Sequence, residues 1–325
     1  MIPPVAHFIW IGREFPYLNF AAVASAAKRG GFSRVVLHHS DDLSHAPWWR
    51  ALHASSTVEC RRISPGKLVE RICGAELARR YAFLSAPAAL TNVLRVAILL
   101  EEGGVYLDLD TVTVKALTPL REASSFFCGS EHVAFPASLE GSKNPLRWAA
   151  ALARTGLRDL TRRSANGVDW FHEIRSLYPL AANNAVLGAE PGHPFLRELC
   201  GRMLALTDQQ YQRRYALGTS LLQHALRETA CSRVTLHPPS YFYPLGPELS
   251  EHWFRFDSAA RLEDVLTENT YVVHWYASVR TKSIAPQVDP AWVERHRDRQ
   301  LLSALLVRAL GTELLGAFPH EERAA

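Results

Sequence analysis

Two aspartates separated by one residue, Asp108 and Asp110, are the clearest candidates for chemistry in this sequence. They stand in the apolar segment 105–112, directly after a Gly-Gly pair. If this segment is one extended strand, both carboxylates project from one face and Leu109 projects from the other. Two carboxylates so placed repel each other unless a cation lies between them. Oxygen ligands of this kind suit Mg²⁺ or Mn²⁺.

An Asp-x-Asp pattern is short, and solvated turns and strand ends also carry it. One metal-dependent reaction that fits is that of a haloacid-dehalogenase-type phosphohydrolase, with Asp108 as nucleophile and Asp110 as acid/base. That fold needs a later acidic pair, whereas the only Asp-Asp, Asp41-Asp42, lies upstream, and Thr111 stands where glycine is usual. The other fitting reaction is sugar transfer from a nucleotide diphosphate, in which a metal neutralises the leaving diphosphate.

The elements that must position the pair predict an α/β fold. Residues 5–12 (VAHFIWIG) and 34–38 have the composition of buried strands, and the alanine-rich residues 20–30 predict a helix between them. This order favours a parallel sheet, which binds ligands at the carboxyl ends of its strands. Residues 87–104 predict a helix that ends at the Gly-Gly pair, and residues 105–112 predict the strand of the acidic pair.

The pattern after residue 120 is less regular. Residues 180–189 (LAANNAVLGA) hold a polar pair among apolar residues, and residues 233–236 and 271–275 predict strands. Four prolines between 238 and 247 predict a structured loop, and the last residues predict helix. We find no internal repeat and no linker that splits the chain.

Composition limits the class of protein. The chain has 325 residues, 48% apolar and 21% charged, which excludes disorder and coiled coil as the main architecture. A net charge of +4 suits an anionic ligand but is too diffuse to indicate nucleic acid, so we expect no nucleic-acid partner. Five scattered cysteines without a CxxC pair favour a reducing compartment. Neither a signal peptide nor a membrane span is recognisable, so we expect a cytoplasmic protein, at most peripheral to a membrane.

Two groups of motifs carry a resemblance to a known family. Asn92-Val93-Leu94-Arg95 followed by GGVYLDLD (103–110) resembles the SDxxR…GGxYxDxD pattern of the DXD-containing sugar-transferase family. VAHFIWIG resembles its opening strand, including the version in the glucosyltransferase domain of large clostridial toxins. The C-terminal half resembles alpha-1,4-glycosyltransferases such as globotriaosylceramide synthase, through Asn183-Asn184-Ala185, Gly192-His193-Pro194, VTLHPPSYFYPLG and TYVVHWYAS. The motifs run in the family's order from about Ile2 to about Ser283.

This resemblance implies a GT-A-type nucleotide-diphospho-sugar transferase fold, with a mixed, mostly parallel central sheet flanked by helices. It implies one such domain over residues 1–290, with the donor half at about 1–120 and the acceptor half at about 121–290. A C-terminal helical segment, 291–325, would follow. The implied activity is a retaining, metal-dependent transfer of a hexose or N-acetylhexosamine from a UDP-sugar to a glycan or glycolipid acceptor. The implied cofactor is Mn²⁺ or Mg²⁺.

The resemblance also assigns site residues. Catalysis falls to Asp108, Asp110 and Arg95, and metal binding to Asp108, Asp110 and His274. Donor binding falls to Trp10, Gly12, Asn92, Arg95, Tyr106, Asp108, Asn183 and Asn184. Trp10 would stack on uracil, and core packing is its alternative role. The alternatives are an ion pair with an acid for Arg95, a buried core histidine for His274, and turn or capping roles for Asn183, Asn184 and His193.

The sequence departs from the family pattern at two places. Thr91-Asn92 replaces Ser-Asp, and because Asn92 keeps an acceptor oxygen but loses the charge, the donor sugar is open. A catalytically inactive sugar-binding relative is therefore an alternative. Gly218-Thr219 replaces Gly-Pro on the acceptor side, so the acceptor is open too. We expect a bacterial cytoplasmic enzyme of surface glycan synthesis or, alternatively, a toxin-like effector that glucosylates a protein.

The C-terminal segment combines a basic cluster with an apolar stripe. Arg295, Arg297 and Arg299 precede leucines at roughly helical spacing, from Leu301 to Leu315. We expect this stripe either to dock on the catalytic domain or to attach the protein to an anionic membrane surface that carries a lipid-linked glycan acceptor.

Overall fold

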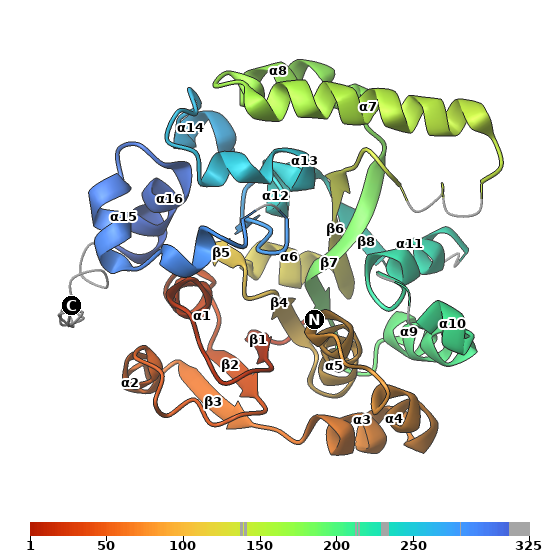
Figure 1. The fold of residues 1–325 in the computed structure, drawn as a ribbon. Coiled ribbons are helices and arrows are strands. Elements are labelled where there is room, and N and C mark those ends of the chain that lie inside the picture. Colours follow the sequence, from red (N-terminus) through yellow and green to blue (C-terminus); the bar gives the residue numbers. More distant parts are fainter. Residues whose placement is uncertain are drawn as a thin grey trace.

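The computed structural model describes residues 1–311, apart from 137, 138, 140, 141, 212, 214, 229–233 and 280. Its centre is a seven-stranded sheet in the order β3-β2-β1-β4-β7-β6-β8 (Figure 1). The strands are β1 (Val5–Trp10), β2 (Arg34–His39), β3 (Val58–Arg62), β4 (Gly104–Leu107), β6 (Phe126–His132), β7 (Leu180–Ala189) and β8 (Val234–His237). A second sheet pairs β5 (Thr111–Thr113) with β9 (Val272–His274).

The sheet is mixed and mostly parallel. Strands β3, β2, β1 and β4 pair in parallel, β7 runs antiparallel to both β4 and β6, and β8 is parallel to β6. The predicted α/β architecture, a mixed, mostly parallel sheet flanked by helices, is confirmed.

Helices cover both faces of the sheet (Figure 1). In the first half they are α1 (Tyr17–Arg29), α2 (Trp49–Ala54), α3 (Pro65–Cys73), α4 (Ala75–Tyr81), α5 (Pro87–Glu102), α6 (Thr118–Ala123), α7 (Pro145–Arg163) and α8 (Gly167–Ile174). Then follow η2 (Arg175–Leu177), α9 (Pro194–Ala205), α10 (Asp208–Tyr211), α11 (Thr219–Glu228), α12 (Pro239–Phe242), α13 (Gly246–Leu249), η3 (Ser250–Trp253), α14 (Leu262–Val265), η4 (Ala285–Gln287), α15 (Pro290–His296) and α16 (Leu301–Leu310).

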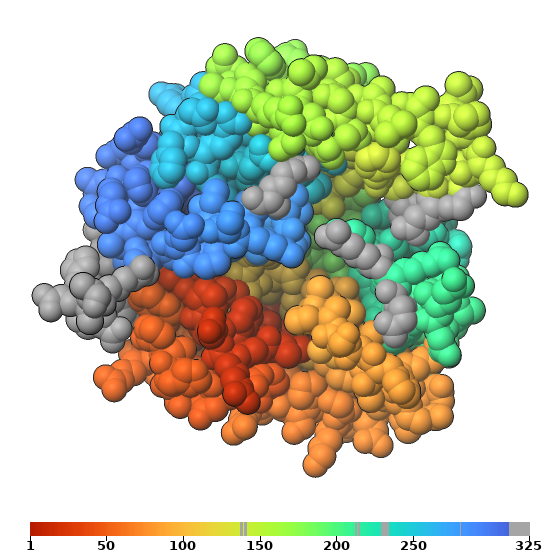
Figure 2. Space-filling view, viewed as in Figure 1, coloured from red at the N-terminus to blue at the C-terminus, as the bar shows by residue number. Residues whose placement is uncertain are grey.

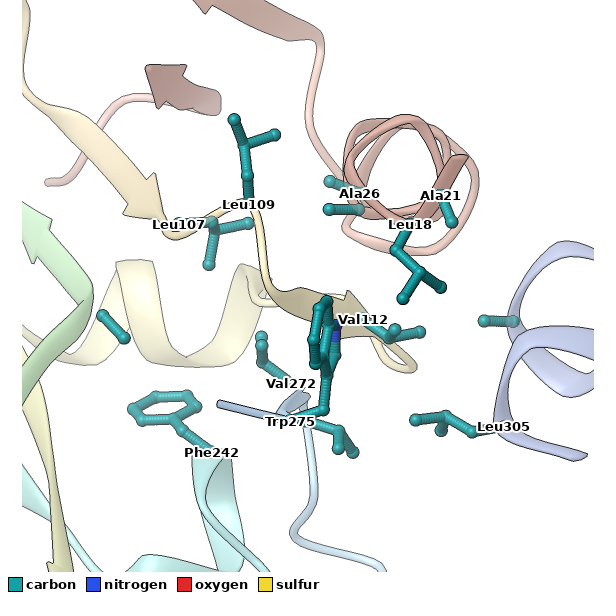
Figure 3. Packing of buried hydrophobic residues seen from close by; sticks show 14 of the residues in the cluster. Leu18, Ala21, Ala26, Leu107, Leu109, Val112, Phe242, Val272, Trp275 and Leu305 are labelled. Carbon is teal, nitrogen blue, oxygen red and sulfur yellow. The ribbon is translucent and has the colours of Figure 1, made fainter. Parts of the chain in front are cut away.

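Two apolar cores lie on the two faces of the sheet. One joins α1 and α16 to the small β5–β9 sheet, and Figure 3 shows Leu18 of α1, Val112 of β5 and Leu305 of α16 side by side. The other holds the apolar faces of α5, α9 and α11. Small residues on α1, such as Ala21 and Ala26, are fully buried, which lets this helix pack closely.

The acidic pair does not lie within one strand, contrary to the expectation for residues 105–112. β4 ends at Leu107, and Asp108–Asp110 form a turn into β5. The backbone N–H and the hydroxyl of Thr111 both donate to the Asp108 carbonyl, at 3.2 and 2.7 Å, which closes the turn. The segment 105–112 is therefore not one strand: it comprises the end of β4, the turn that carries both aspartates, and the start of β5.

The proline-rich segment after β8 also differs from the loop that was expected. It forms two short helices, α12 and α13, each with a proline in its first turn. Proline suits this position because its missing N–H would have no partner inside the helix.

The C-terminal helices belong to the core. Leu301, Leu302, Leu305, Leu306 and Leu310 of α16 are buried, and α16 lies against α1. Lys28 and Arg29, at the end of α1, donate hydrogen bonds to the last carbonyls of α16. The described part of the leucine stripe therefore docks on the domain, while Leu314 and Leu315 lie outside the described residues. None of the described helices is long and apolar enough to span a membrane.

Candidate active site

The pairing of β5 with β9 brings His274 to the acidic pair. His274 lies opposite Thr111 in this register, one residue beyond Asp110. Its Nε2 lies 3.0 Å from Oδ1 of Asp110. The backbone N–H of Ala277 donates to Oδ2 of the same carboxylate at 2.8 Å, and the N–H of Trp275 donates to the Asp110 carbonyl at 3.0 Å. The segment 274–277 therefore fixes Asp110.

Asp108 is held from the main sheet instead. Its N–H donates to the Ala185 carbonyl of β7 at 2.8 Å. The Tyr106 hydroxyl donates to its Oδ1 at 2.6 Å, and a guanidinium nitrogen of Arg95 lies 3.0 Å from the same oxygen. Both side-chain contacts are to Oδ1, so Oδ2 stays outside them.

Arg95 joins three parts of the site. It is 4% exposed on α5, and its guanidinium carbon lies 4.4 Å from the centre of the Tyr106 ring. One nitrogen, Nη1, donates to the Asn184 carbonyl at 2.5 Å, and Nη2 binds Asp108. The ion pair with an acid, one of the two roles expected for Arg95, is present.

The charges in this cluster compensate one another. Burial would raise the pKa of Asp110, but the neighbouring His274 and the hydrogen bonds to His274 and Ala277 lower it overall. Burial would lower the pKa of His274, but Asp110 outweighs it and raises that pKa. For Asp108, burial raises the pKa, and the Arg95 guanidinium opposes this only in part.

The donor set fits a divalent cation. One ligand atom each from Asp108, Asp110 and His274 lie within 4.8 Å of one another. Two carboxylates and an imidazole suit Mn²⁺, and carboxylates alone suit Mg²⁺. The half-buried acidic pair also needs positive charge nearby: Arg95 lies 3.0 Å from Asp108, and the raised pKa of His274 favours its charged form beside Asp110.

Two regions of the chain match family models. Residues 28–127, which include the acidic pair, match the glycosyltransferase sugar-binding region containing the DXD motif. Residues 209–293, which include His274, match the alpha-1,4-glycosyltransferase conserved region. The chain is a glycosyltransferase homologue. No curated protein is similar enough in sequence to count as a match.

Solved glycosyltransferase structures are similar to this homologue at low sequence identity. Mouse xyloside xylosyltransferase 1 has 14% identity and a TM-score of 0.47, over 83% of this chain and 96% of that one. The PaToxG glycosyltransferase has 15% identity and a TM-score of 0.45, over 70% and 69%. The galactosyltransferase LgtC, in complex with donor and acceptor sugar analogues, has 14% identity and a TM-score of 0.45, over 98% of each chain.

Asn92 and Asn184, which were both expected at the donor site of this chain, lie next to each other. The Asn184 amide donates to the Asn92 side-chain oxygen at 2.9 Å. Gly218 lies against this pair, because a Cβ atom there would come within 2.7 Å of the Asn92 amide nitrogen. The two positions at which the sequence departs from the family pattern, Asn92 and Gly218-Thr219, are therefore neighbours in space.

Glu131 and Tyr276 belong to the same region, and the sequence reasoning missed both. The Tyr276 hydroxyl donates to the Glu131 carboxylate at 2.6 Å, and the Asn183 side chain also hydrogen-bonds that carboxylate. Burial raises the pKa of Glu131. The centres of the Tyr276 and His274 rings are 4.0 Å apart. An acid within the apolar strand 126–132 was the one signal available in the sequence.

Trp10 and Gly12 lie at the edge of the sheet where Asp108 lies, because β1 and β4 are parallel neighbours and both end there. Trp10 is half-buried, and its ring meets the edge of the Phe15 ring at 5.6 Å. The Gly12 N–H donates to the Asp41 carboxylate at 3.2 Å. Figure 2 shows a hollow near the middle of one face, bordered by N-terminal, green and blue segments.

His193 lies elsewhere. It lies four residues beyond the end of β7, whose first half carries Asn183 and Asn184, so it is at the opposite ends of the strands from these two residues. Its Nδ1 accepts from the N–H of Phe195 at 3.2 Å and caps α9. Of the roles expected for His193, the structure has the capping role.

Proposed function

We propose that this chain transfers a sugar from a nucleotide-diphosphate donor with the help of a divalent cation. The observation that carries the proposal is the convergence of Asp108, Asp110 and His274 within 4.8 Å, at the edge of the sheet where β1 and β4 end. Parallel sheets bind nucleotides at this edge. The resemblance to DXD-containing transferases favours a UDP-sugar, with a hexose or N-acetylhexosamine transferred with retention.

The three side chains would hold Mn²⁺ or Mg²⁺. The ion would neutralise the charge that develops on the leaving diphosphate. Ala277 orients Asp110 through its N–H, and Arg95 ties Asp108 to the backbone of Asn184. Arg95 would therefore hold the Asp108 carboxylate at a fixed position relative to β7 during the reaction.

Asn92, Asn184 and Asn183 would contact the donor sugar, and Trp10 with Gly12 would contact the base. The acidic residue of the family pattern is an amide here, so the sugar would be bound by neutral hydrogen bonds. We place the acceptor, by resemblance, among glycans or lipid-linked glycans on the cytoplasmic side. The phosphohydrolase alternative gains no support, since Arg95 and Tyr106 already bind the carboxylate that would be its nucleophile.

A panel of nucleotide sugars with Mn²⁺ tests the proposal, scored for nucleotide release by slow hydrolysis without acceptor. UDP release from one sugar, lost in Asp110→Asn, would support it. If the protein bound UDP but released no UDP from any nucleotide sugar, it would be an inactive sugar-binding relative, and the proposed transferase activity would be overturned. Phosphate release from simple phosphoesters without nucleotide-sugar turnover would favour the phosphohydrolase.

A further inference from the structure

The helix α7 presents an apolar face that the described part of the domain leaves exposed. It runs along one end of the molecule (Figure 1), and among its described side chains only Ala151 and Thr161 are buried. Leu146 is 77% exposed, Leu160 67% and Leu152 62%. Exposed apolar patches of this kind mark interaction surfaces rather than ordinary protein surface.

The exposed apolar residues of α7, apart from Leu152 and Trp148, form a stripe. At 3.6 residues per turn, one line of α7 carries Leu146, Ala149, Ala150, Ala153, Leu157 and Leu160. The opposite side of the helix faces the domain, where Arg158 and Arg162 pair with Glu248 and Glu251. Trp170 of the adjoining α8 is also half-exposed.

Basic residues flank this stripe. Helical spacing places Arg163 on one side of it and Arg147 on the other, on the line that carries Arg158 further along the helix, and the side chains of Arg147 and Arg163 are both exposed. Between residues 143 and 163 the chain has six basic residues and one acid, Asp159. Asp159 is held by Arg158 and Arg162, so it does not offset the outer arginines.

The apolar stripe and its flanking arginines favour one of two binding partners, a second copy of the chain or an anionic lipid surface. A second copy of the chain would bring two such basic helices against each other, and like charges across an interface are unfavourable. An anionic lipid surface offers the opposite charge together with an apolar interior for the leucines. A long helix with an apolar stripe flanked by arginines is the pattern of helices that lie in the plane of a membrane interface.

We infer that α7 is the site at which this protein binds an anionic membrane surface, with its leucine stripe in the lipid boundary and Arg147 and Arg163 at the headgroups. The C-terminal leucines were the other candidates for a membrane contact, but the described ones are buried, whereas the leucines of α7 are exposed. The inference does not rest on the proposed function, but it would bring a sugar-transferring site to a lipid-linked acceptor.

Sedimentation of the full-length protein with vesicles tests this inference. The protein should bind vesicles of phosphatidylcholine with phosphatidylglycerol at low salt, weakly bind phosphatidylcholine alone, and lose affinity as salt rises. The double variant Leu146→Glu/Leu160→Glu should lose at least about tenfold in affinity, since two apolar side chains leave the lipid. Arg147→Gln and Arg163→Gln should each lose about fivefold at low salt.

Two controls keep the outcome clear. Leu236→Glu changes an exposed leucine of β8 and should bind like the wild type, and thermal melting should show that the α7 variants are folded. Asp110→Asn should also bind normally, which separates this test from the proposed function. The inference is wrong if anionic vesicles are not bound at low salt, or if the double variant binds unchanged. A dimer in light scattering that Leu160→Glu dissociates would assign α7 to a second copy instead.

Discussion

The charge of His274 depends on whether a cation occupies the acidic pair. In the structure the imidazole lies 3.0 Å from the Asp110 carboxylate, and this neighbour raises the pKa of His274 although burial lowers it. The raised pKa favours the protonated imidazole, which would supply part of the positive charge that the two half-buried carboxylates need. A metal ligand must be a neutral imidazole, so the ion and the proton compete for the same nitrogen.

This competition predicts that Mn²⁺ binding releases a proton near neutral pH. Because the pKa of His274 is raised, Mn²⁺ affinity should rise with pH until the imidazole is neutral in the free protein. Calorimetry at one pH in buffers of different ionisation enthalpy measures the released proton directly. His274→Gln should bind Mn²⁺ more weakly and without this release. Identical heats in all buffers for the wild type would contradict the prediction.

Arg95 predicts a large effect on stability. Arg95→Met removes the guanidinium that lies 3.0 Å from the half-buried Asp108 carboxylate and leaves the Tyr106 hydroxyl as the remaining side-chain partner of that oxygen among the described residues. The free energy of unfolding without metal should fall by about 3 kcal/mol, the low end for a broken buried pair, because water reaches the Asp108 carboxylate. Chemical denaturation measures the loss. The matched control is Arg71→Met, which breaks an exposed ion pair with Glu101 and should leave the free energy of unfolding nearly unchanged.

At the scale of elements, a buried histidine pair joins three strands. His7 Nε2 lies 2.9 Å from the Gly103 carbonyl, and His7 Nδ1 lies 3.0 Å from His38 Nε2. Since a carbonyl only accepts, His7 Nε2 carries the proton and His38 Nε2 donates to His7 Nδ1. The pair thus links β1 and β2 to Gly103, the residue before β4, and burial, which lowers the pKa of both rings, favours their neutral forms.

The pair predicts an acid-sensitive fold. Burial lowers the pKa of His7 from 6.5 to about 4 and holds the pKa of His38 well below its usual value. The unfolded chain takes up these protons as pH falls below about 6.5 and the folded chain does not, so stability falls between about pH 6.5 and 4. His7 accounts for about 3 kcal/mol of that loss.

Urea unfolding of the wild type and His7→Asn across this pH range checks the prediction. The variant is expected to be less stable at pH 7 and to have a flatter pH dependence, because one titrating ring is gone. Parallel curves for the two proteins would show that the histidine pair does not control acid stability.

The docking of α16 on α1 is also testable by mutation. Leu305 is fully buried, and Figure 3 shows it in the cluster that also holds Leu18 of α1 and Val112 of β5. Leu305→Ala should reduce the free energy of unfolding by about 2–5 kcal/mol through lost burial and the cavity left behind. Leu152→Ala on the exposed face of α7 is the matched control, expected within about 0.5 kcal/mol. Equal effects would mean that α16 contributes nothing to the core.

At the scale of the whole molecule, the sequence predicted elements whose signals are local. The first strand, α1 and α5 are apolar segments that each end near a glycine, and β2 is a short apolar run of strand composition. The turn at Asp108–Asp110 could not be predicted, because β5 exists only by pairing with β9, and that partner lies far along the chain. The local alternation of residues 105–112 therefore favoured one continuous strand.

The site shows the same limit. Asp108 and Asp110 stand out by their spacing, whereas His274 follows no spacing rule and was expected only by resemblance. Glu131, on β6, and Tyr276, two residues beyond β9, are hydrogen-bonded although they lie 145 residues apart in sequence. A single acid in an apolar strand carries no local sign of such a contact, so the sequence could not assign it to the site.

The central claim is that Asp108, Asp110 and His274 hold a divalent cation that binds the diphosphate of a nucleotide donor. Calorimetric titration of UDP into the wild type and Asp110→Asn, each with Mn²⁺ and with EDTA, tests it most directly. The account predicts strong UDP binding only for the wild type with Mn²⁺, with both proteins melting as folded domains. Equal UDP affinity in Mn²⁺ and in EDTA, or unchanged affinity in Asp110→Asn, would contradict it.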